Sequence, residues 1–162
     1  MELDYKKKLL GKVIGKISER ERIIGDSVHY KREAAVTAPS RNESRYDSTK
    51  AEHSMMAELL ETGREEVKDG LAKLLDLDLQ MDCFNIGIGS IVELVNESNG
   101  SSESYFLLPY GGGEEVTFAD KTIQVVTPSS PMFIALKNRK SGEDFELKRG
   151  DKSTPYFIVN SS

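Results

Sequence analysis

Charged side chains gather around residue 43, where two carboxylates stand four positions apart. Glu43 and Asp47 would share one face of a helix, because residues at i and i+4 lie one turn apart. Carboxylate oxygens are ligands that Mg²⁺ prefers, so the pair predicts a transient Mg²⁺ contact and no stable metal site. A second interpretation stays open, in which Glu43 caps a helix and Asp47 favours its positive end. Arg41 and Arg45 add positive charge, which a metal site would not favour.

The stretch before this cluster has helical periodicity without a proline. Residues that recur in alternating steps of four and three positions form a ladder, which predicts an apolar seam that faces a partner helix. The ladder consists of Leu10, Ile14, Ile17, Ile24, Val28 and Ala35, with the polar Glu21 and Lys31 in the two remaining positions. Pro39 disfavours helix at the residue before it. Ser40 followed by Glu43 is a capping-box pattern, which predicts that a second helix starts near residue 41.

The second helix is predicted to run to about Leu75. Its ladder is Tyr46, Thr49, His53, Met56, Leu60, Gly63, Val67, Gly70 and Leu74, and Leu59, Leu71 and Leu75 widen the stripe. Two helices joined by a short turn should pack against each other. We therefore predict an antiparallel helical hairpin, a coiled coil, over residues 1–77, with its turn at about residues 36–42.

The remaining half, residues 78–162, changes to short apolar runs separated by turn signals. We predict that these runs form the strands of a small sheet, and they lie at residues 86, 88, 91–92, 94–95, 105–108, 116–118, 123–126, 145–147 and 156–159. Gly111–Gly113 is interpreted as a hairpin turn, because no lysine or helix start follows it as in a phosphate loop. Ser130 and Pro131 suit the cap and first turn of a short helix, Met132–Leu136. The fold class is α+β, with the hairpin followed by an antiparallel β-domain that has one short helix.

Bulk composition excludes several classes of protein. The 162 residues carry a net charge of −5 and a single cysteine, Cys83, which excludes an internal disulfide and a thiolate metal cluster. No apolar run approaches the roughly 18 residues of a membrane span, and the first residues lack the apolar stretch of a signal peptide. Neither half is basic enough for an independent duplex DNA binder. A cytoplasmic protein that contacts no membrane is the default expectation.

Several short strings, in this order, resemble the Gre family (the GreA/GreB family) of bacterial transcription elongation factors. The strings are Ile88-Gly89-Ser90-Ile91-Val92-Glu93-Leu94, Ser130-Pro131, Ala135-Leu136, Gly142-Glu143-Asp144-Phe145 and Tyr156-Phe157-Ile158. The order of a helical hairpin before a β-rich domain is also that of the family. The resemblance implies that the β-domain is similar to FK506-binding proteins (FKBP-like) and docks at the rim of the secondary channel of bacterial RNA polymerase core. The coiled coil would then reach down that channel.

The resemblance also implies which residues do the work. In the family, two acidic residues at the hairpin tip help to hold a Mg²⁺ ion in the polymerase active site, and the polymerase then cleaves backtracked RNA. The protein itself would be no enzyme and would need no cofactor beyond that shared Mg²⁺. Docking residues in the β-domain would be Ser130, Pro131, Met132, Phe133, Lys137 and Arg139, although Met132 and Phe133 are also interpretable as core, which their apolar character favours.

The tip departs from the family pattern. Aligned on Tyr46, the two acidic positions fall on Pro39 and Asn42, so only Glu43 and Asp47 could compensate. The predicted contacts of the tip with polymerase or nascent RNA are Arg41, Asn42, Arg45 and Tyr46. Two mechanisms stay open: stimulation of RNA cleavage, and occupation of the channel without cleavage. The missing acids favour the second.

A different class of function also fits the sequence. The coiled coil and the FKBP-like domain could form a protein-interaction or chaperone-like module that is unrelated to polymerase. In that case the coiled coil would act as a dimerisation arm. An intramolecular hairpin predicts a monomer instead, so the oligomeric state separates the two interpretations.

Overall fold

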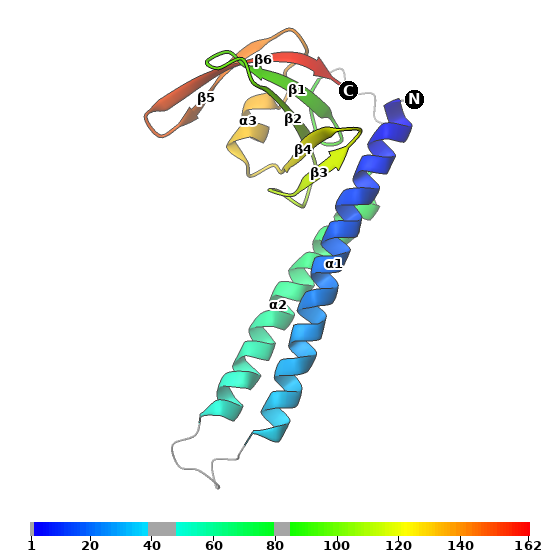
Figure 1. Ribbon diagram of the computed structural model, residues 1–162, viewed down its shortest axis with the longest axis vertical. Coiled ribbons are helices and arrows are strands. Elements are labelled where there is room, and N and C mark those ends of the chain that lie inside the picture. The colour runs from blue at the N-terminus through cyan, green and yellow to red at the C-terminus, as the bar shows by residue number, and fades with distance from the viewer. Residues whose placement is uncertain (1, 39–47, 80–84) are drawn as a thin grey trace. The chain divides into compact units, whose positions relative to one another are not determined.

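The computed structural model describes residues 2–38, 48–79 and 85–162. Its chain forms two compact units, one of Met1–Ile14 with Lys73–Ser162 and one of Gly15–Ala72. Two long helices, α1 (Glu2–Thr37) and α2 (Thr49–Leu75), make a helical hairpin, and the C-terminal part is a six-stranded sheet with one short helix (Figure 1). The predicted fold class is therefore confirmed.

The seam of α1 follows the predicted ladder. Ile17 and Val28 are 0% and 2% exposed, and each of the other ladder residues is buried or half-buried. The polar ladder position Glu21 is half-buried as well, because Arg64 of α2 pairs with it across the seam. One apolar seam with a polar insertion thus joins the two helices.

The seam of α2 differs from the prediction at two positions, because Ala57 and Arg64 take the places of Met56 and Gly63 in it. Met56 is 45% exposed, whereas its neighbour Ala57 is 3% exposed and occupies the seam. Between His53 and Leu60 the heptad pattern allows two seam positions. The path through Met56 has steps of three and then four residues, and the path through Ala57 has steps of four and then three. The helix takes the second path, so Met56, with Leu59 and Leu75, points to solvent rather than into the seam.

Six strands form one sheet in the order β3-β4-β2-β1-β6-β5. Their bounds are β1 (Ile91–Asn96), β2 (Ser102–Leu107), β3 (Glu115–Phe118), β4 (Lys121–Val126), β5 (Asp144–Arg149) and β6 (Lys152–Ser161). All neighbouring pairs are antiparallel except β2 and β4, which are parallel. The sheet is therefore mostly antiparallel.

The Gly111–Gly113 segment is not the predicted hairpin turn, because β2 and β3 are not neighbours in the sheet. The chain crosses over after β2, forms β3, and returns so that β4 lies beside β2. Gly111 and Gly113 have φ angles of 90° and 86°, a backbone conformation that glycine adopts without steric cost. The short turn of this region is Ala119–Asp120, between β3 and β4.

The core of the β-domain lies between the sheet and α3 (Pro131–Leu136). Met132, Phe133 and Leu136 of α3 pack with alternate residues of the strands, such as Leu94 and Leu107. This alternation is the period of two that a strand requires when one face is covered. Pro131 begins the helix as predicted, but the Ser130 side chain makes no capping hydrogen bond.

The first turns of α1 belong to the same compact unit as the sheet. The ring of Tyr5 meets that of Phe118 edge-on, with centroids 5.0 Å apart. Lys12 Nζ donates a hydrogen bond of 2.8 Å to the carbonyl oxygen of Thr117 and lies 5.1 Å from the centre of the Phe118 ring. These contacts connect the N-terminal end of α1 to strand β3.

Candidate functional site

The predicted tip residues lie outside the described part of the chain. These are the acidic pair Glu43 and Asp47 and the proposed contact residues Arg41, Asn42, Arg45 and Tyr46. On the described side of the gap, the Ser48 hydroxyl donates a hydrogen bond to the carboxylate of Glu52, and the Glu52 backbone N–H donates to the Ser48 carbonyl at 2.9 Å. A carboxylate in the first turn of α2 suits the positive end of the helix dipole.

An ion-pair network crosses the middle of the hairpin. Arg64 Nε donates a hydrogen bond of 2.6 Å to Glu21 Oε1, and their side chains are 29% and 20% exposed. Glu61 lies 3.3 Å from Arg32 and 3.9 Å from Arg64, so charges alternate across the two helices. The hydrogen bond to Glu21 raises the pKa of Arg64, which therefore stays charged.

Gly25 makes the space that this network needs. A Cβ atom at residue 25 would lie 2.9 Å from the guanidinium carbon of Arg64, closer than such atoms approach. Glycine in a helix interior costs roughly 1 kcal/mol relative to alanine. Gly25 lowers the helix propensity of α1, but it accommodates the Arg64 side chain. The network is structural, and it sets which residues of the two helices lie opposite each other.

The predicted docking residues of the β-domain divide into buried and exposed groups. Met132 and Phe133 are 3% and 4% exposed and belong to the core, so their side chains are not a docking surface. Their spacing with Leu136 places them on the face of α3 that packs on the sheet. Pro131 and Lys137 are exposed, and Ser130 is half-buried.

Ile134 is the exposed apolar residue of α3 that the sequence prediction missed. Its side chain is 66% exposed, and it lies three positions after Pro131, on the same side of the helix. The hydrophobic pattern of the segment could have indicated it, because Ile134 lies off the face defined by Met132, Phe133 and Leu136. We call Pro131, Ile134 and Lys137 the α3 surface.

Arg139 is a structural residue that holds the end of α3 to the start of β5. Its Nε donates a hydrogen bond of 2.7 Å to the Ala135 carbonyl, and its Nη1 donates one of 3.3 Å to the Asp144 carbonyl. The guanidinium carbon also lies 5.5 Å from the centre of the Phe145 ring, and Glu143 is 3.7 Å from Nη1. These contacts hold the C-terminal end of α3 against the start of β5, and so keep the α3 surface in place.

A polar hollow on the sheet was also missed by the sequence prediction. Glu103 Oε2 accepts hydrogen bonds from the hydroxyls of Tyr105, at 2.6 Å, and Tyr156, at 3.4 Å. Burial, and then the Glu103 carboxylate, raises the pKa of Tyr105, and the same causes raise that of Tyr156. Both tyrosines stay protonated at neutral pH. The hollow beside them has a volume of about 450 Å³, and Arg149 and Gln124 also line it.

No metal site is found among the residues that the structure describes. In the ranges 2–38, 48–79 and 85–162 no cluster of three or more histidine, cysteine, aspartate or glutamate side chains could hold a metal ion. That search does not include Glu43 and Asp47, so the transient Mg²⁺ contact stays a prediction. Within the same ranges no helix has the length and apolar character needed to cross a membrane.

Solved structures similar to this chain come from transcription factors. One is described as the transcription factor Gfh1, with 19% identity over 93% of this chain and 91% of that chain and a TM-score of 0.39. A second, the GreA factor homolog 1 (Gfh1) protein of Thermus thermophilus, has 16% identity over 92% and 94% of the two chains and a TM-score of 0.39. A third, the prokaryotic transcription elongation factor GreA/GreB from Nitrosomonas europaea, has 22% identity over 67% and 90% and a TM-score of 0.36.

These TM-scores are low, so no residue role follows from the likeness. No protein-family model matches the sequence, and no curated protein matches it either.

Proposed function

We propose that this protein is a transcription elongation regulator that binds bacterial RNA polymerase core. The observation that supports it is the order of parts, in which helices of 36 and 27 residues precede a six-stranded sheet domain. The strings that resemble the Gre family lie at matching places, since Ser130-Pro131 opens α3 and Ile91-Val92-Glu93-Leu94 forms most of β1. At 1.5 Å per residue α1 is about 50 Å long, a length that suits an arm entering a narrow channel.

The β-domain would dock through the α3 surface at the rim of the secondary channel. An exposed isoleucine between an exposed proline and an exposed lysine offers an apolar centre with a charged border, the composition of many interface centres. The buried side of α3 and the contacts of Arg139 keep this surface in one shape, which lowers the entropy cost of binding.

The hairpin would act by occupying the channel. Holding a second Mg²⁺ needs carboxylate oxygens at the tip, and the positions that carry them in the Gre family are Pro39 and Asn42 here. Proline has no side-chain oxygen, and an amide is a neutral ligand. We therefore propose that the protein alters pausing or initiation and gives little stimulation of RNA cleavage, with no catalytic activity of its own.

Binding to core polymerase tests the proposal. Full-length protein should bind immobilised core enzyme, and Ile134→Asp should weaken binding by roughly tenfold, as loss of a central apolar residue does at many interfaces. Val159→Asp is the matched control, because Val159 is 49% exposed and follows Ile158, which packs in the core with α3, so Val159 faces the opposite side of the sheet. Absence of binding by the unsubstituted protein would refute the function. Equal binding of both variants would refute docking through the α3 surface.

A further inference from the structure

A second apolar stripe runs along the hairpin, outside the seam that joins its helices. This second seam consists of Ile23, Ser27, Tyr30 and Ala34 on α1, and of Met56, Leu59 and Gly63 on α2. Successive members are three or four positions apart, the spacing that keeps a stripe facing another helix. Its large side chains nevertheless face solvent, with 53% of Ile23, 66% of Tyr30 and 59% of Leu59 exposed.

The two halves of the second seam lie on the same side of the hairpin. Arg32 of α1 and Glu61 of α2 meet at 3.3 Å on one flank, and each follows a buried seam residue by four positions. These buried residues are Val28 of α1 and Ala57 of α2. Ser27 precedes Val28 by one position, and Met56 precedes Ala57 by one position. In an antiparallel helix pair these two kinds of position flank the seam on opposite sides. The ion pair therefore places both halves of the stripe together on the other flank.

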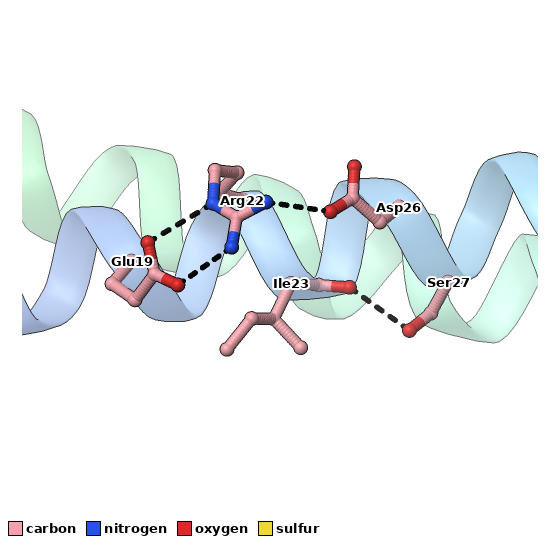
Figure 2. Close-up of polar contacts among 5 residues, drawn as sticks. All are labelled: Glu19, Arg22, Ile23, Asp26 and Ser27. Atoms are coloured by element: carbon pink, nitrogen blue, oxygen red, sulfur yellow. Dashed lines mark hydrogen bonds and ion pairs between the residues drawn. The ribbon is translucent and has the colours of Figure 1, made fainter.

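The surrounding side of α1 is charged and already paired. Arg22 lies 2.7 Å from Glu19 and 2.9 Å from Asp26, and Figure 2 shows the Ile23 side chain pointing away from these ion pairs. Ser27 Oγ donates a hydrogen bond of 2.9 Å to the Ile23 carbonyl. The serine hydroxyl is thus satisfied within the helix, so this position can be covered by an apolar partner without leaving its donor unpaired.

We infer that the second seam pairs with the same seam of a second copy, so that two hairpins form a four-helix bundle. The spacing requires a helical partner, and the hairpin of another copy presents a helix pair with this spacing. Large side chains alternate with the small residues Ser27, Ala34 and Gly63. The large side chains of one copy can therefore pack into the spaces beside the small residues of the other copy. One face serves both copies, as in any twofold symmetric dimer.

The exposed area suits a weak dimer. The four large side chains are 45–66% exposed, which leaves on the order of 400 Å² per copy at about 150–250 Å² for each large side chain. Two such faces with the small residues between them approach roughly 1,000 Å², the lower end for specific interfaces. Dimerisation is therefore expected to depend on protein concentration. It does not rest on the proposed binding to polymerase, and a hairpin paired in this way would not occupy the channel at the same time, so the dimer and the polymerase-bound form are alternatives.

Sedimentation velocity and light scattering of the full chain test the pairing, from low micromolar to submillimolar concentration. The dimer fraction of the unsubstituted protein should rise with concentration. Leu59→Lys should lower the association constant by roughly tenfold or more, as the loss of one large apolar side chain per copy implies. Val36→Lys is the control, because Val36 is 80% exposed and follows a seam residue by one position, on the other flank.

Each other outcome overturns the inference. A protein that stays monomeric throughout the range has no such pairing. Equal loss of dimer in Leu59→Lys and Val36→Lys would place the contact elsewhere. A monomeric protein whose affinity for core polymerase falls with Leu59→Lys would assign the second seam to a different protein. Circular dichroism of each variant confirms that the helices are intact.

Discussion

Glu103 organises two tyrosine side chains whose ionisation should limit stability at alkaline pH. The pKa of Tyr105 and that of Tyr156 are raised in the folded chain, so folding favours their protonated forms. This contribution is fully present below the tyrosine pKa of the unfolded chain, about 10, and is lost as pH rises toward the higher folded values. Absorbance at 295 nm should therefore show tyrosine ionisation that continues above the pH range of an unfolded chain.

The Tyr105→Phe variant checks the assignment of that titration. One late-titrating tyrosine should disappear, and the free energy of unfolding at neutral pH should fall by about 1–2 kcal/mol, because a hydrogen bond to a carboxylate is lost. A late-titrating component that is absent from the unsubstituted protein, or that Tyr105→Phe leaves unchanged, would show that the Glu103 pair does not form in solution.

Removing one partner of the Glu21–Arg64 ion pair should lower the melting temperature more than replacing both partners. Removing one partner, as in Arg64→Leu, leaves Glu21 half-buried without its guanidinium, and the melting temperature should fall by several degrees. The double variant Glu21→Leu with Arg64→Leu should recover most of this loss, since an apolar pair can replace a buried ion pair.

An exposed ion pair on the same helix supplies the control for that prediction. The Arg22 side chain is 62% exposed, so Arg22→Leu should leave the melting temperature nearly unchanged. Thermal unfolding followed by circular dichroism measures all four proteins. A double variant no more stable than Arg64→Leu alone would contradict the argument.

At the scale of elements, the turn between β3 and β4 has residues that suit it poorly. Ala119 and Asp120 have φ angles of 50° and 63°, and alanine in this region costs about 1–2 kcal/mol. Asn-Gly is the preferred pair in such a two-residue turn. Ala119→Asn with Asp120→Gly should therefore raise the free energy of unfolding by about 1 kcal/mol in urea titrations. Gly100→Ala, at a φ of 72°, should lower it.

The elements themselves were largely predictable, because their patterns are local. The α1 ladder is a period of 3.5 over several heptads, and the Ser130-Pro131 pair marks the start of α3 at the right residue. The choice between Met56 and Ala57 was not predictable, since both fit a heptad and only the rotation of α2 against α1 decides. Hydrophobicity favoured methionine, and the packing of the hairpin favoured alanine.

Contacts between distant segments account for the other differences. Strand order depends on which strands pair in the folded sheet, so no local sequence pattern indicates the parallel pairing of β2 with β4. Glu103 and Tyr156 are 53 residues apart, and Glu21 and Arg64 are 43 apart. Neither pair can be derived without knowing the register of the sheet or of the hairpin. Ile134 was missed for a different reason, because the sequence prediction assigned the apolar docking contacts of this segment to its neighbours Met132 and Phe133, which the structure buries.

At the scale of the whole molecule, the hairpin and the β-domain have separable roles under the proposed function. The α3 surface would supply affinity, and the tip would decide the effect on transcription. Because Met1–Ile14 forms one compact unit with Lys73–Ser162, and Tyr5 contacts Phe118 there, a chain cut at residue 77 would lose part of that unit. Substitutions in the full-length protein therefore separate the two roles better than truncation.

Cleavage of backtracked RNA decides what the tip does. We expect weak or absent stimulation by the unsubstituted protein and by both Glu43→Ala and Asp47→Ala, with transcription still perturbed when any of them is in excess. The reason is chemical, since the Gre acidic positions are Pro39 and Asn42 here and neither side chain supplies a carboxylate for Mg²⁺. The assay compares the three proteins on stalled complexes at several Mg²⁺ concentrations, with binding to polymerase measured alongside. Strong cleavage that collapses in both variants would instead establish Glu43 and Asp47 as a displaced acidic pair that holds Mg²⁺.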